Sequence, residues 1–267
     1  MVKTLTFTAS DIVNKSLKAM KEVKTARFSL KGWERVGESH IESEYDIKFR
    51  SHPFATYIFC KYPNEGAEIL YREGENKNQA LVKPNGFPWI NLNLDPAGAL
   101  IRDNSHHTIS EMGFSYMHGI INNAVHKCKA QKNFKKIFSI EPPHFWLEYD
   151  VVTIKIDFPD YAFIPYVVKE NETLVDIARK FFLSENKILT LNKLKNYNSV
   201  EAGQEILIPN GYAKTTILFI DIKTHLPVRQ EMYDDLGKYE VYEYHKLKVN
   251  EDIPEEEFTS KFPAYGF

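Results

Sequence analysis

The sequence predicts an α+β protein, with a large antiparallel sheet covered by helices and a small βααβ unit near the middle of the chain. Three observations lead to this prediction. Long runs on both sides of the middle alternate apolar and polar residues, which is typical of half-buried strands. Short turns separate the runs, so consecutive strands should pair antiparallel in a meander. Two further segments repeat apolar residues every three to four positions, which indicates helices.

The first half of the chain is expected to open with a helix over Ser10–Lys24, capped by Ser10. A loop is expected at Leu92–His107, where Asp95-Pro96 marks a turn, and a second helix at Ser110–Gln131. The strands between the first helix and the loop are expected at Thr25–Val36, Ser39–Arg50, Phe54–Tyr62, Ala67–Arg72 and Gln79–Lys83.

Strands of the same style continue in the second half and flank residues 166–209 on both sides. Pro254–Phe258 is expected to be a short helical turn with its glutamates in solvent. The simplest organisation is therefore an insertion, with a discontinuous body at 1–160 plus 214–267 and an inserted domain at 165–211. The later strands are expected at Phe134–Glu141, Phe145–Asp150, Val151–Asp157, Thr215–Lys223, Val228–Tyr233 and Lys238–Val249.

The segment Tyr166–Pro209 has the pattern of two strands enclosing two short helices. Thr173 and Asp176 fit a capping box for the first helix, and Ser184 is placed to cap the second. Asn192 is expected to end the second helix, as a residue that tolerates left-handed geometry. Gly203 then permits the turn into the closing strand.

This order of elements, with Asn192-Lys193-Leu194 closing the second helix, resembles the LysM module, which recognises N-acetylglucosamine in peptidoglycan and chitin. The resemblance implies a shallow groove between two loops, where backbone groups hold the N-acetyl group. The chain departs from the usual Gly-Asp-Thr at Asn171-Glu172-Thr173 and has Val175 at a frequent contact position, so a structural or protein-binding insert is the alternative. The implied glycan-binding residues are Glu170, Asn171, Glu172, Thr173, Asn192, Lys193, Leu194, Lys195 and Asn196.

The flanking regions resemble the Lol-type lipoprotein carriers and an uncharacterised family of bacterial envelope proteins with that fold. The phrases that carry the resemblance are Ser51-His52-Pro53-Phe54, Glu68-Ile69-Leu70-Tyr71, Leu94-Asp95-Pro96 and Tyr265-Gly266-Phe267. The resemblance implies a curved sheet, a half-open barrel, over an apolar space. That space is either filled by side chains or open to a lipid, lipoprotein or protein partner.

Composition and motifs narrow the function further. The net charge of −2 argues against a nucleic-acid partner bound through its phosphates. His106-His107 lacks the spacing of a metal site, and no nucleophile, phosphate or dinucleotide motif occurs, so neither an enzyme nor a cofactor is expected. Cys60 and Cys128 are expected to be buried free thiols, with a disulfide as the alternative.

The expected location is the periplasm or cell envelope. No run reaches the ~20 apolar residues of a membrane span, so an integral membrane protein is not expected. Met1–Phe7 has no continuous apolar core of a secretory signal. A cell-wall ligand favours the interpretation that a signal peptide has been removed.

Overall fold

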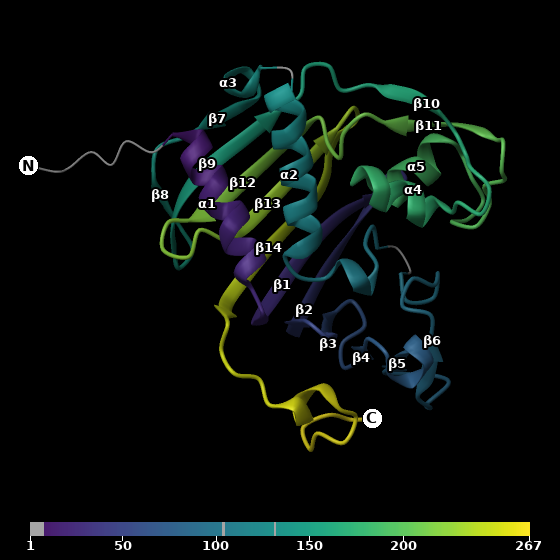
Figure 1. Ribbon diagram of the computed structural model, residues 1–267. Coiled ribbons are helices and arrows are strands. Elements are labelled where there is room, and N and C mark those ends of the chain that lie inside the picture. The colour runs from purple at the N-terminus through teal and green to yellow at the C-terminus, as the bar shows by residue number, and fades with distance from the viewer. Residues whose placement is uncertain (1–7, 103–104, 131) are drawn as a thin grey trace, which may run out of the picture. The chain divides into compact units, whose positions relative to one another are not determined.

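The computed structural model describes residues 8–102, 105–130 and 132–267, and over these residues the chain has an α+β fold (Figure 1). The α-helices are α1 (Ala9–Glu22), α2 (Ser115–Ala130), α3 (Phe134–Ile137), α4 (Leu174–Phe181) and α5 (Glu185–Leu191). Three 3₁₀ turns are η1 (Asn76–Asn78), η2 (Ile109–Glu111) and η3 (Glu255–Phe258). The strands are β1 (Thr25–Val36), β2 (Ser39–Ser51), β3 (Phe54–Tyr62), β4 (Glu68–Arg72), β5 (Ala80–Lys83), β6 (Leu92–Leu94), β7 (Phe138–Ile140), β8 (His144–Trp146), β9 (Tyr149–Asp157), β10 (Phe163–Val167), β11 (Glu205–Pro209), β12 (Thr215–Asp221), β13 (Pro227–Asp234) and β14 (Gly237–Val249).

Among the described residues, twelve strands form one sheet in the order β6-β5-β4-β3-β2-β1-β14-β13-β12-β9-β7, with β8 paired to β9. β10 and β11 form a separate pair. β1 to β5 each pair antiparallel with the next strand in sequence. The register between β1 and β2 runs without a break from Thr25↔Arg50 to Val36↔Ser39. The predicted α+β class and antiparallel meander are therefore confirmed.

The chain divides into two compact units. The first comprises residues 1–17, 116–227 and 231–239, and the second comprises residues 18–115, 228–230 and 240–267. Within the described parts, the first unit holds α2 to α5 and β7 to β12. The second unit holds β1 to β6 and nearly all of β14.

The core of the second unit explains where one predicted helix begins. A Cβ added to Gly113 would lie 2.6 Å from the ring of Phe49, and Gly113 has a φ of +88°. Phe114 then stacks on Tyr244 with ring centroids 5.4 Å apart. Because a left-handed residue interrupts a right-handed helix, the predicted helix Ser110–Gln131 was too long, and α2 begins only after Gly113.

Four other features differ from the prediction. Thr8, not Ser10, caps α1, since its Oγ1 accepts a hydrogen bond from the Asp11 amide at 3.1 Å. The expected strand Phe134–Glu141 starts as the helical turn α3, in which the rings of Phe134 and Phe138 stack. The β8–β9 turn falls at Leu147, which has a φ of +50°. The predicted loop at Leu92–His107 also begins with the short strand β6.

The acidic turn near the C-terminus binds cations within the second unit. Glu257 accepts two hydrogen bonds from the Arg27 guanidinium, at 2.8 and 2.6 Å, and one from Lys48 at 2.6 Å. Glu255 pairs with Arg50 and Arg72. These hydrogen bonds hold the pKa of Glu257 down at about 2, against the opposing effect of partial burial. The expectation that these glutamates lie in solvent was therefore wrong for Glu257, whose side chain is 12% exposed.

Both cysteines are buried free thiols, as expected. Burial raises the pKa of each thiol, with Lys127 partly opposing the effect at Cys128.

Candidate functional site

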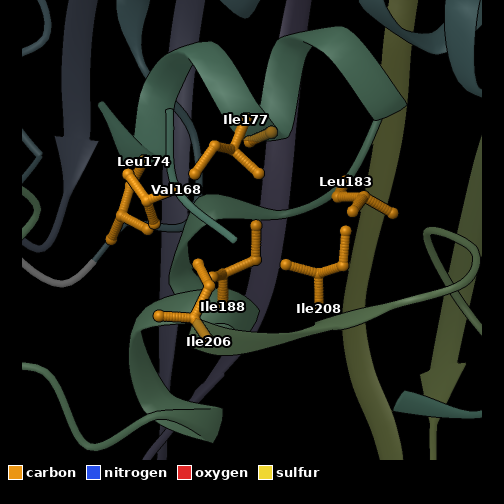
Figure 2. Packing of buried hydrophobic residues seen from close by; sticks show 8 residues of the cluster. Val168, Leu174, Ile177, Leu183, Ile188, Ile206 and Ile208 are labelled. Carbon is orange, nitrogen blue, oxygen red and sulfur yellow. The ribbon is translucent and has the colours of Figure 1, made fainter. Parts of the chain in front are cut away.

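Residues 163–209 fold as the predicted βααβ unit. β10 and β11 pair antiparallel from Phe163↔Pro209 to Val167↔Glu205. The two strands and two helices enclose one apolar core, to which α4 contributes buried residues at helical spacing and α5 contributes Ile188 (Figure 2). The core residues are Val168, Leu174, Ile177, Ala178, Leu183, Ile188, Ile206 and Ile208.

The incoming and outgoing chains of this unit lie side by side. The Asn210 amide donates to the carbonyl of Ala162 at 2.9 Å, and the Ala162 amide donates to Asn210 Oδ1 at 3.1 Å. Asn210 Nδ2 also donates to the carbonyl of Asp160 at 2.7 Å, and the Phe158 amide donates to the carbonyl of Lys214 at 2.8 Å. An inserted domain requires such hydrogen-bonded entry and exit segments. The boundaries 165–211 remain a prediction.

Both predicted helix caps are confirmed. Thr173 Oγ1 accepts from the Asp176 amide at 3.2 Å, and Asp176 Oδ2 accepts from the Thr173 amide at 2.9 Å. Ser184 Oγ accepts from the Lys187 amide at 3.3 Å. Asn192 ends α5 as expected, with a φ of −96°, and the left-handed residue is the following Lys193, with a φ of +51°.

In the first predicted loop, the Glu172 carboxylate is already engaged within the unit. It accepts from the Tyr166 hydroxyl at 2.8 Å, from the Lys169 amide at 3.0 Å and from Lys180 Nζ at 3.3 Å. Partial burial raises the pKa of Glu172, but these donors outweigh burial and the net pKa is lowered. Asn171, with a φ of +59°, is exposed beside it.

The second predicted loop is fastened in the same way. Asn192 Nδ2 donates to the carbonyls of Ile188 and Leu207, at 2.8 and 2.7 Å, and the Leu207 amide returns a bond to Asn192 Oδ1 at 2.8 Å. Asn196 Oδ1 accepts from the Asn198 amide at 2.9 Å and from the Ser199 hydroxyl at 3.0 Å. These two asparagines set the shape of the loop.

Both loops are therefore anchored to one core. Leu174 follows the first loop and is buried in the cluster against which Leu194 of the second loop packs. Four of the nine candidate side chains, those of Glu172, Thr173, Asn192 and Asn196, are engaged in internal hydrogen bonds. Exposed side chains remain at Glu170, Asn171, Lys193 and Lys195.

Thr173→Ala tests the structural role of one candidate residue. The substitution removes the side-chain half of the capping box, so it is expected to lower the free energy of unfolding by about 1 kcal/mol. Thr173→Ser keeps the hydroxyl and should retain most of the stability. Urea denaturation of the full chain, with hydrogen exchange read in α4, measures the difference. Equal stability of the alanine variant and the parent chain would contradict the capping role.

Sequence reasoning missed the contacts that hold this unit against α2. Phe182 has a φ of +53°, and a Cβ added to Gly119 would lie 2.1 Å from the ring of Phe182. Asn123 Nδ2 donates to the carbonyl of Phe181 at 3.1 Å, and the Tyr116 hydroxyl donates to that of Leu183 at 2.7 Å. The glycine in a helix was the one available signal, since glycine there often marks close approach.

A buried ion pair adds to this attachment. Lys187 Nζ, on the first turn of α5, donates to Asp234 Oδ2 at 2.7 Å and to Asp235 Oδ1 at 2.5 Å. The side chains of Lys187 and Asp234 are 7% and 1% exposed. Ser184 Oγ also lies 2.7 Å from the Tyr239 hydroxyl. The sequence places Asp234-Asp235 in a turn but gives no sign of a distant lysine.

The second unit contains a buried cluster of histidines and carboxylates. His106 Nδ1 and His107 Nε2 lie 3.0 and 3.5 Å from Glu240 Oε2, and His107 Nδ1 lies 2.9 Å from Glu111 Oε2. Burial raises the pKa of Glu240, but the two histidines outweigh it and bring that pKa to about 2. Burial also disfavours the charged form of His107, yet Glu240 and Glu111 raise its pKa well above the ordinary value.

Among the described residues, each unit lines a cavity. An open groove of about 380 Å³ lies in the second unit, with walls from Trp33, Tyr62 and Glu44. A cavity of about 20 Å³ lies beneath α2 in the first unit, bordered by Ala124 and Phe182. The cavity beneath α2 can hold about one water molecule and is too small for an acyl chain.

No cluster of three or more histidines, cysteines and carboxylates is arranged to hold a metal ion within residues 8–102, 105–130 and 132–267. None of the helices in those ranges combines the length and apolar character needed to cross a membrane.

The chain was compared with known proteins and structures. A search of curated proteins finds no match. The Mycobacterium tuberculosis lipoprotein LppX matches with 11% identity and a TM-score of 0.43, over 92% of this chain and 97% of that one. A LolA superfamily protein from Nitrosomonas europaea has 10% identity and a TM-score of 0.36, over 95% and 98%. MucB, in the Pseudomonas aeruginosa MucA/MucB complex, has 10% identity and a TM-score of 0.42, over 94% and 60%.

The fold assignment rests on the strand order given above. Two family models match parts of the chain. Residues 25–145 match the protein family of unknown function DUF1571, and residues 166–209 match the LysM domain. The chain therefore contains a DUF1571 region at residues 25–145 and a LysM domain at residues 166–209.

Proposed function

We propose that this protein is a non-enzymatic component of the cell envelope that binds N-acetylglucosamine-containing glycan, such as peptidoglycan, through its LysM domain. The observation that carries the proposal is the LysM match over residues 166–209, together with a βααβ unit whose two loops are anchored to one core. The proposed site comprises the two loops at residues 170–173 and 192–196.

The chemistry of these loops suits a neutral sugar. The side chains of Glu172, Asn192 and Asn196 fix the loop backbone, so backbone donors and acceptors are held in place before a ligand arrives. Preorganised groups lose less freedom on binding. Single-site affinity should still be modest, and retention on an insoluble polymer should benefit from many neighbouring sugars.

Retention of the full chain on purified peptidoglycan and on chitin tests the proposal. We expect both polymers to retain the protein and soluble N-acetylglucosamine oligomers to release it. Hydrogen exchange with the oligomers should show protection at residues 169–174 and 192–198. Absence of retention on both polymers would overturn the proposal.

A matched pair of variants locates the site. Asn196→Ala removes the acceptor of two hydrogen bonds that shape the second loop, so retention should weaken about three- to tenfold. Asn198→Ala changes an exposed side chain on the same loop and should retain binding near that of the parent chain. The measurement is a binding isotherm on peptidoglycan. Equal loss in both variants, or in neither, would argue against this location.

A specific observation favours a second candidate, in which the LysM domain is a structural or protein-binding insert. The unit is fastened by the Lys187–Asp234 pair and by Phe182 at Gly119, which a freely presented binding domain does not need. Under this alternative the polymers would not retain the protein, and the oligomers would give no protection at either loop.

A further inference from the structure

The hairpin loop between β5 and β6 presents apolar side chains to solvent. The strands pair from Ala80↔Leu94 to Val82↔Leu92, so the intervening residues form the tip of a hairpin. On this tip Phe87 is 88% exposed, Trp89 is 76% exposed and Ile90 is 62% exposed. Large apolar side chains gathered on a surface mark a site of interaction, because their exposure to water is unfavourable.

The loop is also free of charge. Residues 84–94 read Pro-Asn-Gly-Phe-Pro-Trp-Ile-Asn-Leu-Asn-Leu and contain no acidic, basic or histidine side chain. Transfer of this segment into a medium of low dielectric would therefore bury no charge. The polar residues within it are asparagines, which are neutral and lie on either side of the apolar tip.

Asparagine side chains and one backbone hydrogen bond hold the tip in place. Asn85 Nδ2 donates to the carbonyl of Glu65 at 2.6 Å, and Asn76 Nδ2 donates to Asn93 Oδ1 at 2.7 Å, so both sides of the loop are tied to neighbouring turns or strands. The Trp89 amide donates to the carbonyl of Gly86 at 2.9 Å, and Trp89 has a φ of +58°. A bulky residue in this region is strained, and such strain tends to be retained where it serves a function.

We propose that Phe87, Trp89 and Ile90 form a membrane-contacting tip that inserts into the interface of a lipid bilayer. Tryptophan and other aromatic residues favour the boundary between headgroups and acyl chains. Shallow insertion of a few such residues gives reversible attachment without a membrane span. The tip would bring the second unit to a lipid surface.

The size of the patch favours a bilayer over a protein partner. Three side chains of this size present on the order of 500 Å². A stable protein interface buries about 800 Å² on each partner, so this loop alone falls short of that area. A bilayer imposes no such minimum area, because a loop tip that inserts into it is surrounded by lipid on all sides.

Co-sedimentation of the full chain with vesicles tests the proposal. One vesicle set is phosphatidylcholine, and the other is phosphatidylethanolamine with phosphatidylglycerol. We expect binding to both sets, nearly unchanged between low and high salt, because the loop carries no charge to screen. Brominated lipids should quench tryptophan emission in the parent chain, and Trp89→Phe should remove most of that quenching.

Variants decide whether this loop is responsible. The triple variant Phe87→Ser, Trp89→Ser, Ile90→Ser is expected to bind vesicles at least about tenfold more weakly. Leu236→Ser is the matched control, since Leu236 is 75% exposed on a different turn, and it should bind as the parent chain does. Unchanged circular dichroism melting shows that the triple variant is folded.

Three results would overturn the proposal: no binding of the parent chain to either vesicle set, full binding by the triple variant, or loss of binding at high salt. A parent chain that self-associates through this loop, with monomeric triple variant and no vesicle binding, would assign the tip to a second copy instead.

Discussion

Glu240→Gln is expected to lower the free energy of unfolding by about 3–5 kcal/mol, because it removes the buried carboxylate that His106 and His107 share. Glu240 is 1% exposed and lies within 3.0 Å of His106 and 3.5 Å of His107. Urea denaturation and hydrogen exchange in β14 would measure the loss. Glu42→Gln, at a side chain that is 66% exposed, is the control and should change stability by less than about 0.5 kcal/mol. Similar stability of the two variants would contradict this account.

Because of the same cluster, the free energy of unfolding should fall at both acid and alkaline pH. The pKa of Glu240 falls from 4.5 to about 2 on folding. Its contribution to the free energy of unfolding is therefore present above about pH 4.5 and is lost as the pH falls towards 2. The pKa of His107 is raised from 6.5, so its contribution is complete below 6.5 and is lost as the pH rises through the folded value. Stability of the second unit should therefore be greatest between about pH 4.5 and 6.5.

Urea midpoints measured from pH 3 to pH 9 would show these two slopes. His107→Gln removes the titrating group and should flatten the alkaline side while leaving an acid slope. The groups that face His107 are Glu111, Glu240 and the ring of Tyr242. An alkaline slope of the same steepness in His107→Gln and in the parent chain would assign it to other groups.

Lys187→Met is expected to release the LysM domain from its attachment and to cost about 3–5 kcal/mol, because the carboxylate of Asp234 would stay buried without its cation. Hydrogen exchange in α4 and α5 should rise, and the urea midpoint should fall. The control is Lys195→Met, at an exposed position of the same domain.

A double variant separates the charge effect from packing. Lys187→Met with Asp234→Leu replaces the buried pair by apolar residues, so it should recover much of the stability that Lys187→Met loses. Asp235 is 36% exposed at its side chain and can stay hydrated. A double variant no more stable than the single one would show that the attachment depends on packing around Lys187.

The local elements followed from the sequence because their causes are local. Alternating side chains predicted the strands of the meander, and Thr173 and Ser184 predicted two helix starts from residues only three positions apart. The errors arose where distant residues intervened. Gly113 has a left-handed backbone conformation and lies close to the ring of Phe49, so α2 begins later than predicted. The residue pattern of this segment does not reveal that contact.

The sequence predicted where the two loops of the candidate site lie, but not which of their side chains form internal hydrogen bonds. The LysM pattern placed two loops beside one core. It did not indicate that the side chains of Glu172, Asn192 and Asn196 form hydrogen bonds within the domain. Side-chain hydrogen bonding depends on which backbone groups approach, and that is set by the folded chain. The exposed tip at Phe87 and Trp89 was missed because apolar residues in a sequence look alike whether buried or exposed.

By itself the sequence determined the strand and helix pattern, the LysM domain and the absence of a strong net charge. These depend on residue spacing and composition, which short-range sterics and hydrophobicity translate directly into local structure. The tertiary structure decided which charges pair, as Lys187 does with Asp234, and which side chains reach solvent, as Trp89 does. Both depend on residues far apart in the chain, whose proximity only folding creates.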